Sequence, residues 1–327
     1  MNKIVLLSMK KRTKVSLISL FAIISCSTDK IEEEGEDVTP IASECTSDII
    51  LDTSVGPCTQ TLTFTHQYSE SITGTTRTIT ANSIPEHMVG LFGGGQGSLN
   101  PNAISEQSDT YNITTNPTVA TALTSLSGNN GPDYSFGILF SGVELDPIPA
   151  EPFPHNGMMD PNVNWEWNLE PLNVNIGLDC NYAHVQPNGK YHYHGKPTLF
   201  LDDIGVPTDA MTLIGYAADG FPIYYKFAYS TAMDNSSDVI EMTSSYQLKS
   251  GDRPGDGVTA PCDIYNGVYS SDYEYVISFG TLDEANGRTG VTPEYPAGTY
   301  YYVITDDFPS IPRYFRGSPS SDFEIGQ

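Results

Sequence analysis

The chain has few positive charges. Its 327 residues include 15 lysines and arginines against 40 aspartates and glutamates, which gives a formal net charge of −25 at pH 7. Proteins that bind nucleic acid or an anionic membrane surface through charge use basic residues for it. We therefore expect no nucleic-acid partner. The sequence also has no EF-hand loop pattern, so solubility is the main consequence that we expect from the acidic surface.

The amino-terminal region lacks an apolar run long enough to cross a membrane. A basic cluster at residues 10–14 precedes an apolar run at residues 15–24; about ten residues are too few for a membrane-spanning helix but suit a signal peptide. The residues Ile23-Ile24-Ser25-Cys26 resemble a bacterial lipobox, in which the cysteine is lipidated and becomes the first mature residue. We predict a signal peptide at residues 1–25; the alternative is an ordinary cleaved signal without lipid. Both predict export.

Residues 26–44 have almost no apolar content and include an acidic run at residues 32–37. Such a segment cannot bury a core, so we predict a disordered tether between a lipid anchor on Cys26 and the following domain. An acidic run in this position also resembles the surface-export tethers of some bacterial lipoproteins. The expected location is the bacterial outer membrane or cell surface, outside the cytoplasm, with the membrane as partner through the lipid.

Cysteine is scarce, with five in the chain. If Cys26 carries lipid, four remain for disulfides in an oxidising compartment: Cys45, Cys58, Cys180 and Cys262. Four cysteines allow three pairings. Short loops close most easily, so the preferred pairing joins Cys45 to Cys58 and Cys180 to Cys262. Metal ligation by Cys180 is an alternative.

Helical periodicity is absent from any long stretch, whereas turn-forming residues are plentiful, with 29 glycines and 23 prolines. This favours strands over helices. We predict one all-β domain over residues 45–327, an antiparallel sandwich or barrel-like fold with long Pro/Gly-rich loops and few short helices. The candidate strands are residues 60–66, 76–81, 134–140, 190–194, 212–217, 273–279 and 299–305.

Histidine is also scarce, yet three of the six histidines, His184, His192 and His194, lie in one short segment. On a strand, His192 and His194 point to one face and the intervening tyrosines to the other. The turn signal Pro187-Asn188-Gly189 predicts a hairpin that brings His184 back beside them. Three imidazoles suit a transition metal, with zinc or copper preferred. The alternative is that the histidines are structural.

A three-histidine site leaves a position for water, an oxygen ligand or a substrate. Candidates for a fourth ligand, or for a carboxylate behind a ligating histidine, are Asp179, Asp219 and Glu170. Whether the protein is an enzyme stays open; metal-dependent hydrolysis and redox chemistry both fit such a site.

Other catalytic signatures are missing. Residues 195–200 lack the glutamate that follows His-x-His in a cupin, and the glycines at residues 93–97 lack the Lys-Ser/Thr ending of a phosphate-binding loop. No Gly-x-Ser-x-Gly segment marks a serine nucleophile. These absences exclude the nucleophile classes and leave the histidines as the candidate site.

Tryptophan occurs only twice, at Trp165 and Trp167. On a strand both rings would share one face and could form a platform for a sugar or a peptide. This favours a second function, a non-catalytic extracellular binding module for carbohydrate or peptide. Core packing is the alternative role for both rings.

Several blocks in order resemble the YHYH-domain family, named for Tyr191-His192-Tyr193-His194. The resemblance runs from about residue 79 to residue 317. The matching blocks are residues 82–87, 177–187, 213–224, 282–288, 292–294 and 298–300. The family consists mostly of exported bacterial proteins without an established common activity. The resemblance therefore implies an exported lipoprotein form but no reaction.

Overall fold

The computed structural model describes residues 49–157 and 160–325. The predicted signal peptide (1–25), the predicted tether (26–44), Cys26 and Cys45 lie outside these residues. The described residues belong to one compact unit, Glu44–Gln327. Within them, no helix combines the length and apolar character needed to cross a membrane.

The largest sheet has eight strands and contains the histidine hairpin. Its strand order is β11-β12-β8-β7-β13-β14-β20-β19. Neighbours are antiparallel except for the parallel pairs β12–β8 and β14–β20. The sheet ends at β11 and β19, so it is open and does not close into a barrel. Its strands are β7 (Gly137–Leu139), β8 (Glu144–Leu145), β11 (Ala183–Val185), β12 (Tyr191–Tyr193), β13 (Leu213–Ala217), β14 (Pro222–Tyr225), β19 (Gly287–Gly290) and β20 (Thr299–Ile304).

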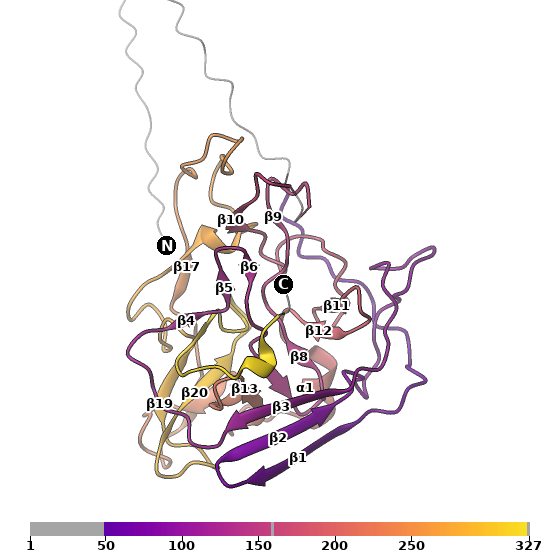
Figure 1. The fold of residues 1–327 in the computed structure, drawn as a ribbon. Helices are drawn as coiled ribbons and strands as arrows, with labels where there is room; N and C mark the ends of the chain where they lie inside the picture. The colour runs from indigo at the N-terminus through magenta and orange to yellow at the C-terminus, as the bar shows by residue number, and fades with distance from the viewer. Residues whose placement is uncertain (1–48, 158–159, 326–327) are drawn as a thin grey trace, which may run out of the picture. The chain divides into compact units, whose positions relative to one another are not determined.

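A three-stranded antiparallel sheet packs against the large one. It consists of β1 (Tyr68–Thr73), β2 (Thr76–Ala81) and β3 (Asp109–Thr114), and it crosses the lower front of Figure 1, with β13 and β20 behind it. Along β2, Arg77, Ile79 and Ala81 are buried and alternate with more exposed threonines, as expected for a strand with one face on the core. Isoleucines from both sheets meet in one apolar cluster.

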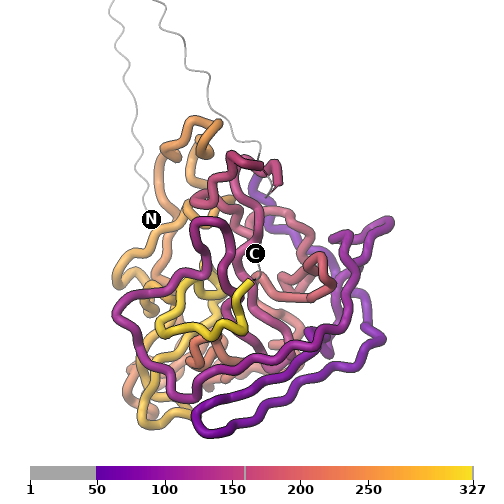
Figure 2. The backbone as a smooth tube through the Cα atoms, in the orientation of Figure 1, coloured from indigo at the N-terminus to yellow at the C-terminus, as the bar shows by residue number. Residues whose placement is uncertain are grey.

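The remaining elements are short and are joined by long loops, which Figure 2 traces along the backbone. Five further two-stranded ladders are described. They are β4 (Thr124–Ser125) with β21 (Tyr314–Phe315), β5 (Ser127–Gly128) with β6 (Gly131–Pro132), β9 (Pro152–Phe153) with β10 (Asn164–Asn168), β15 (Phe227–Tyr229) with β16 (Val239–Glu241), and β17 (Tyr246–Leu248) with β18 (Tyr273–Tyr275). The helices are α1 (Thr198–Ile204), η1 (Ser270–Asp272) and η2 (Ser321–Phe323).

The all-β prediction is confirmed, including the scarcity of helix. Strand β2 has the predicted bounds, and β7, β12, β13, β18 and β20 fall inside predicted segments. The prediction of a strand at residues 60–66 is wrong. That segment makes one isolated bridge, from Gln60 to Val89. It belongs to none of the described sheets, so the rest of the segment has no partner strand.

The preferred disulfide pairing is also wrong, because Cys58 is bonded to Cys180. The chain just before Cys58 runs beside the segment that ends at Cys180: the Gly56 N–H donates to the Leu178 carbonyl at 2.7 Å, and Gly56 forms a parallel bridge with Asp179. This tertiary pairing overrides the preference for short loops. Cys262 is disulfide-bonded as well.

Replacing Cys58 and Cys180 together by serine is expected to lower the free energy of unfolding by roughly 2–5 kcal/mol. The reason is that the bond joins residues 122 apart in the chain and so restricts the unfolded state. Denaturant unfolding of both proteins under the same oxidising conditions measures the difference. An unchanged midpoint and slope would contradict the expected role of this bond.

Candidate metal centre

The hairpin β11–β12 places the three histidines on one face of the large sheet. His184 on β11 lies directly opposite His192 on β12, and the alternation along β12 puts His194 on the same side. The turn between the strands closes as predicted: the Gly189 N–H donates to the Gln186 carbonyl at 2.8 Å, and Gly189 has a positive φ of 88°, which glycine adopts without steric cost.

The three imidazoles converge through their Nε2 atoms. His194 Nε2 lies 2.9 Å from His192 Nε2 and 3.0 Å from His184 Nε2. The ring centroids form a nearly equilateral triangle with sides of 4.6, 4.7 and 4.8 Å. Among the residues that the structure describes, this is the group of histidine, cysteine and acidic side chains whose ligand atoms could hold one metal ion.

Burial and backbone contacts set the protonation of these rings. His192 and His194 are each 1% exposed, and burial holds their pKa values well below the usual histidine range. Burial also lowers the pKa of His184. The Nδ1 atoms of His184 and His192 face the Ile176 and Lys190 carbonyls, each at 3.3 Å. Neutral rings that donate through Nδ1–H present unprotonated Nε2 atoms to the centre of the cluster.

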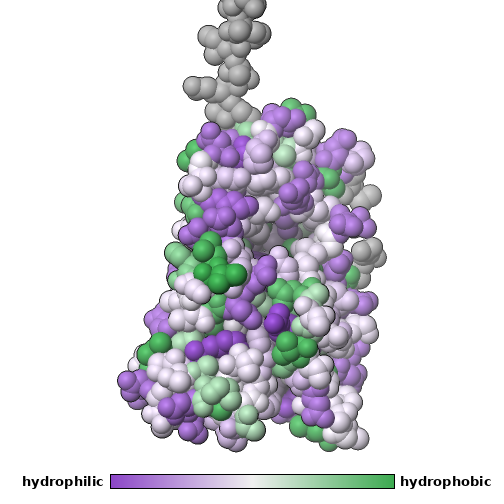
Figure 3. Space-filling model, turned by 90° about the vertical axis from the view of Figure 1, so that its left-hand side faces the viewer, coloured by the Kyte–Doolittle hydropathy of each residue, from purple (hydrophilic) through white to green (hydrophobic). Residues whose placement is uncertain are grey.

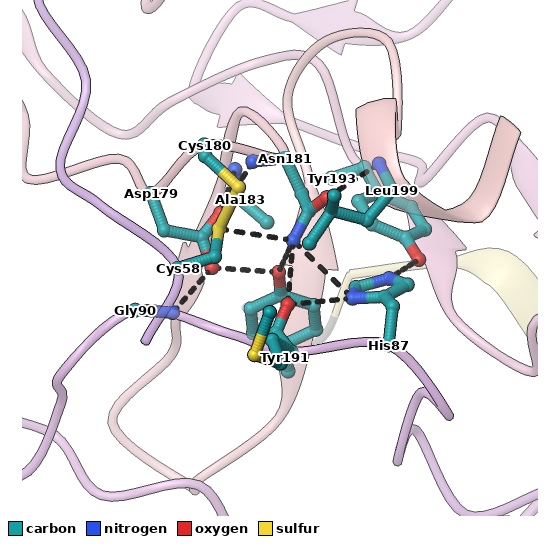
Figure 4. Close-up of a disulfide and its surroundings, with 11 residues drawn as sticks. Cys58, His87, Gly90, Asp179, Cys180, Asn181, Ala183, Tyr191, Tyr193 and Leu199 are labelled. Carbon is teal, nitrogen blue, oxygen red and sulfur yellow. Dashed lines mark hydrogen bonds between the residues drawn. A yellow bond between two sulfur atoms is a disulfide. The ribbon is translucent and has the colours of Figure 1, made fainter. Parts of the chain in front are cut away.

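The tyrosines of the same strand point to the opposite face and enter a buried hydrogen-bond network (Figure 4). The Tyr191 hydroxyl donates to Asp179 Oδ2 at 2.8 Å. The Tyr193 hydroxyl lies 2.7 Å from His87 Nε2. Asn181 Nδ2 donates to the Tyr191 hydroxyl at 3.3 Å, and the disulfide of Cys180 borders the network. The side chains on both faces of β12 therefore make polar contacts that fix their positions.

The three carboxylates predicted beside the histidines are bonded elsewhere. Asp179 accepts from Tyr191 on the tyrosine face. Both oxygens of Glu170 accept from Arg313 Nη2 at 2.9 Å. Asp219 Oδ2 accepts from the Tyr302 hydroxyl at 2.5 Å and from the Gly317 N–H at 2.8 Å. None of the three belongs to the candidate metal group, which contains the histidines alone.

Asp146 is a carboxylate that the sequence analysis missed. It follows β8, and its N–H donates to the Tyr193 carbonyl at 2.8 Å, which continues the β8–β12 ladder. Because Glu144 pairs with His192 in this ladder, position 146 falls on the histidine face of the sheet. Nothing in the local sequence marks this aspartate, because its position depends on a parallel pairing between distant segments.

The Asp146 carboxyl is buried and only partly hydrogen-bonded. Gln186 Nε2 donates to Oδ2 at 3.0 Å, whereas Oδ1 is buried without a hydrogen-bond partner. Burial, with the nearby Glu144 carboxylate as the next cause, raises the pKa of Asp146 to about 7. A buried polar atom without a partner is uncommon and calls for a physical reason.

Neither tryptophan belongs to the histidine cluster. Both are on β10, where Trp167 is buried against the Tyr269 ring and Trp165 is partly exposed. Both rings line a cavity of about 880 Å³ that none of the three histidines lines. The cavity and the histidine cluster therefore share no residue, although Arg313 lines the cavity and its charge adds to the effect of burial in lowering the pKa of His194.

Comparison with known proteins identifies one family. A family model described as "YHYH protein" matches residues 110–317, a span that contains the whole histidine hairpin. No curated protein and no solved structure matches the chain.

Replacing Asp219 by asparagine is expected to change how stability depends on pH. Burial raises the pKa of Asp219 to about 6, above its value in an unfolded chain, so its contribution to stability is complete below about pH 4 and is lost as the pH rises through 6. The wild type should therefore lose roughly 2 kcal/mol more than the variant between pH 4 and pH 7.5.

Denaturant unfolding of the two proteins across this range measures the effect. Only the difference between them reports Asp219, because other buried groups titrate in both proteins. Parallel pH curves for the two proteins would contradict the assignment.

Proposed function

The chain belongs to the YHYH protein family, and we propose that its domain binds a transition-metal ion, zinc or copper, through His184, His192 and His194. The observation that carries this proposal is the convergence of three buried Nε2 atoms, with two separations of 2.9 and 3.0 Å around His194. Imidazole nitrogen is a preferred ligand of both metals.

The orientation of the rings supports the proposal. In metal sites, a ligating histidine commonly donates its other N–H to a carbonyl or carboxylate, which fixes the ring and its tautomer. The Nδ1 atoms of His184 and His192 face backbone carbonyls in this manner. With these tautomers, the Nε2 lone pairs of two rings point at the third ring. Without a metal, a single Nε2–H on His194 can donate to only one of these two lone pairs, so the other nitrogen contact stays uncompensated, whereas a cation between the nitrogens attracts all three.

The spacing also suits an ion of this size. Tetrahedral coordination with bonds of about 2.0–2.1 Å separates neighbouring nitrogen ligands by about 3.3 Å. The two Nε2 separations around His194 are a few tenths of an ångström shorter, so small ring rotations would open the cluster to that size. Because burial lowers the pKa values of all three histidines, no proton has to leave a cationic ring at neutral pH before a metal binds.

Three nitrogen ligands leave a further position for water, an oxygen ligand or a substrate. We propose that Asp146 lies beside this open position, because it is on the histidine face and its Oδ1 has no hydrogen-bond partner. From there a carboxylate can accept a hydrogen bond from a group bound at the open position. If the protein is an enzyme, hydrolysis and redox chemistry both suit such a centre.

The proposed setting is extracytoplasmic. In this proposal, residues 1–25 are a signal peptide, Cys26 carries the lipid, residues 26–44 are a tether, and residues 45–327 are the metal-binding domain at the outer membrane or cell surface. The lipobox-like residues before Cys26 and the acidic composition of the tether support it. The disulfide between Cys58 and Cys180 suits an oxidising compartment.

Protein purified without a histidine tag and then loaded with zinc or copper is expected to retain about one ion per chain, because the three rings form one site. The double variant His192→Ala, His194→Ala should retain none, and His66→Ala is the matched control, since His66 lies outside the cluster and contacts the Ile84 carbonyl. Elemental analysis after dialysis measures the content. Equal metal content in the double variant and the wild type would refute the site.

Replacing Asp146 by asparagine is expected to weaken zinc binding by roughly 10–100-fold, the usual effect of removing a carboxylate behind the ligands. Competition with a chromophoric chelator at pH 8, where the Asp146 carboxyl is ionised, measures the affinity. Asp219→Asn is the control, because it removes an equally buried carboxyl that is hydrogen-bonded to Tyr302 and Gly317. Wild-type affinity in Asp146→Asn would exclude Asp146 from the site and leave the histidine proposal standing.

A further inference from the structure

The cavity that both tryptophans line is formed by segments far apart in the sequence. Residues 125–129, 162–168, 246–273 and 308–314 contribute to it, and its volume is about 880 Å³. This is within the range of small-molecule sites in proteins, about 300–1,000 Å³. Figure 3 shows a hollow on the side of the molecule where β4 and β17 lie in Figure 1.

Trp165 forms a supported aromatic surface in this cavity. A Cβ at position 131 would lie 3.0–3.1 Å from three carbons of the six-membered ring of Trp165, so one indole face packs on the backbone of Gly131. The side chain remains partly exposed and lines the cavity. A ring that is fixed from behind loses little conformational entropy when a ligand packs on its open face.

A second group of aromatic rings lines the same cavity. Tyr273 and Phe308 stack with ring centroids 3.9 Å apart and an interplanar angle of 7°. Tyr246 packs edge-on against Phe308 at 5.4 Å. All three residues line the cavity. The Arg313 guanidinium lies over the Phe308 ring as well, 5.5 Å from its centroid. These rings hold one another in place, so they line the cavity without rearrangement.

The few charges that line the cavity nearly balance one another. Lys249 Nζ donates to the Ser271 carbonyl at 2.7 Å and lies over the Tyr265 ring. Arg313 donates to both oxygens of Glu170, and the exposed Glu166 adds negative charge. With Lys249 and Glu166 of opposite sign, the lining has no excess of charge that would select a charged ligand. Short hydroxyl and amide side chains also line the cavity, among them Ser125, Ser127, Asn129 and Asn162; of these, Ser125 accepts from the Ser127 N–H and Asn162 donates to Asp160.

We propose that this cavity binds a neutral carbohydrate, namely a short stretch of an uncharged oligosaccharide. Sugar rings have apolar C–H faces that pack on aromatic rings, and their hydroxyls pair with hydroxyl and amide side chains. Aromatic side chains, uncharged polar groups and the near balance of charge between Lys249 and Glu166 match this chemistry. This site is separate from the proposed metal centre, because none of the three histidines lines the cavity.

Tryptophan fluorescence provides a direct test, because the only two tryptophans of the chain both line the cavity. The probes are cellohexaose, xylohexaose, mannohexaose and laminarihexaose, with hexagalacturonate and a neutral hexapeptide as comparators. We expect a saturable change in emission with at least one neutral hexaose and none with the comparators. Failure of all four neutral sugars, or binding of a comparator alone, would overturn the proposal.

Variants assign the binding to the cavity. Trp165→Ala should weaken binding of the positive hexaose at least tenfold in calorimetry, and Trp165→Phe, which keeps an aromatic ring and the fold, should weaken it less. Phe279→Ala is the matched control, because Phe279 is an aromatic residue that is 60% exposed and does not line the cavity. Undiminished binding by Trp165→Ala would refute this site.

The metal-site double variant His192→Ala, His194→Ala separates the two proposals. It should bind the positive hexaose as the wild type does, within a factor of two, because the cavity is built from other residues. Equal loss of sugar binding in this folded variant would show that the sugar occupies the histidine site, and would overturn the assignment to the tryptophan cavity.

Discussion

Strand β12 lies between β11 and β8, and its side chains are buried on both faces of the sheet. Because side chains alternate along Tyr191–His194, the imidazoles lie on one face and the phenol rings on the other. The tyrosine face is tied to Asp179 and His87 by hydrogen bonds of 2.8 and 2.7 Å. A shift of the strand by one residue would place the imidazoles in this network and the phenols in the cluster. The polar contacts of both faces therefore hold the register.

The tyrosine network also positions the histidines, although it touches none of the three. Asp179, Cys180 and Asn181 come from the segment that enters β11, and the disulfide joins that segment to Cys58. The tyrosine face of the hairpin is thereby fixed by hydrogen bonds and the disulfide, while the three imidazoles lie close together on the other face. A site that must keep ligand atoms within tenths of an ångström benefits from such support, because ligands on a loosely held strand would separate.

Sequence patterns predicted the features of this site that residues close together in the chain determine. Pro187-Asn188-Gly189 predicted the hairpin, the alternation of residues 190–194 predicted the two faces, and the candidate strand at residues 76–81 has the bounds of β2. Contacts between distant segments could not be predicted in this way. The pairing of Cys58 with Cys180 follows from a bridge at Gly56, and the position of Asp146 follows from the parallel ladder β8–β12.

Strand β11, which carries His184, is the last strand of its sheet, and such a strand commonly exposes backbone groups to which another chain can add. Here the outward groups are occupied from within the domain. The Asp179 N–H donates to the Ala183 carbonyl at 2.9 Å, and Asn102 Nδ2 donates to the Val185 carbonyl at 2.9 Å. These bonds use two carbonyls that β11 would otherwise offer to an added strand, so the edge that carries His184 is closed by the domain's own residues.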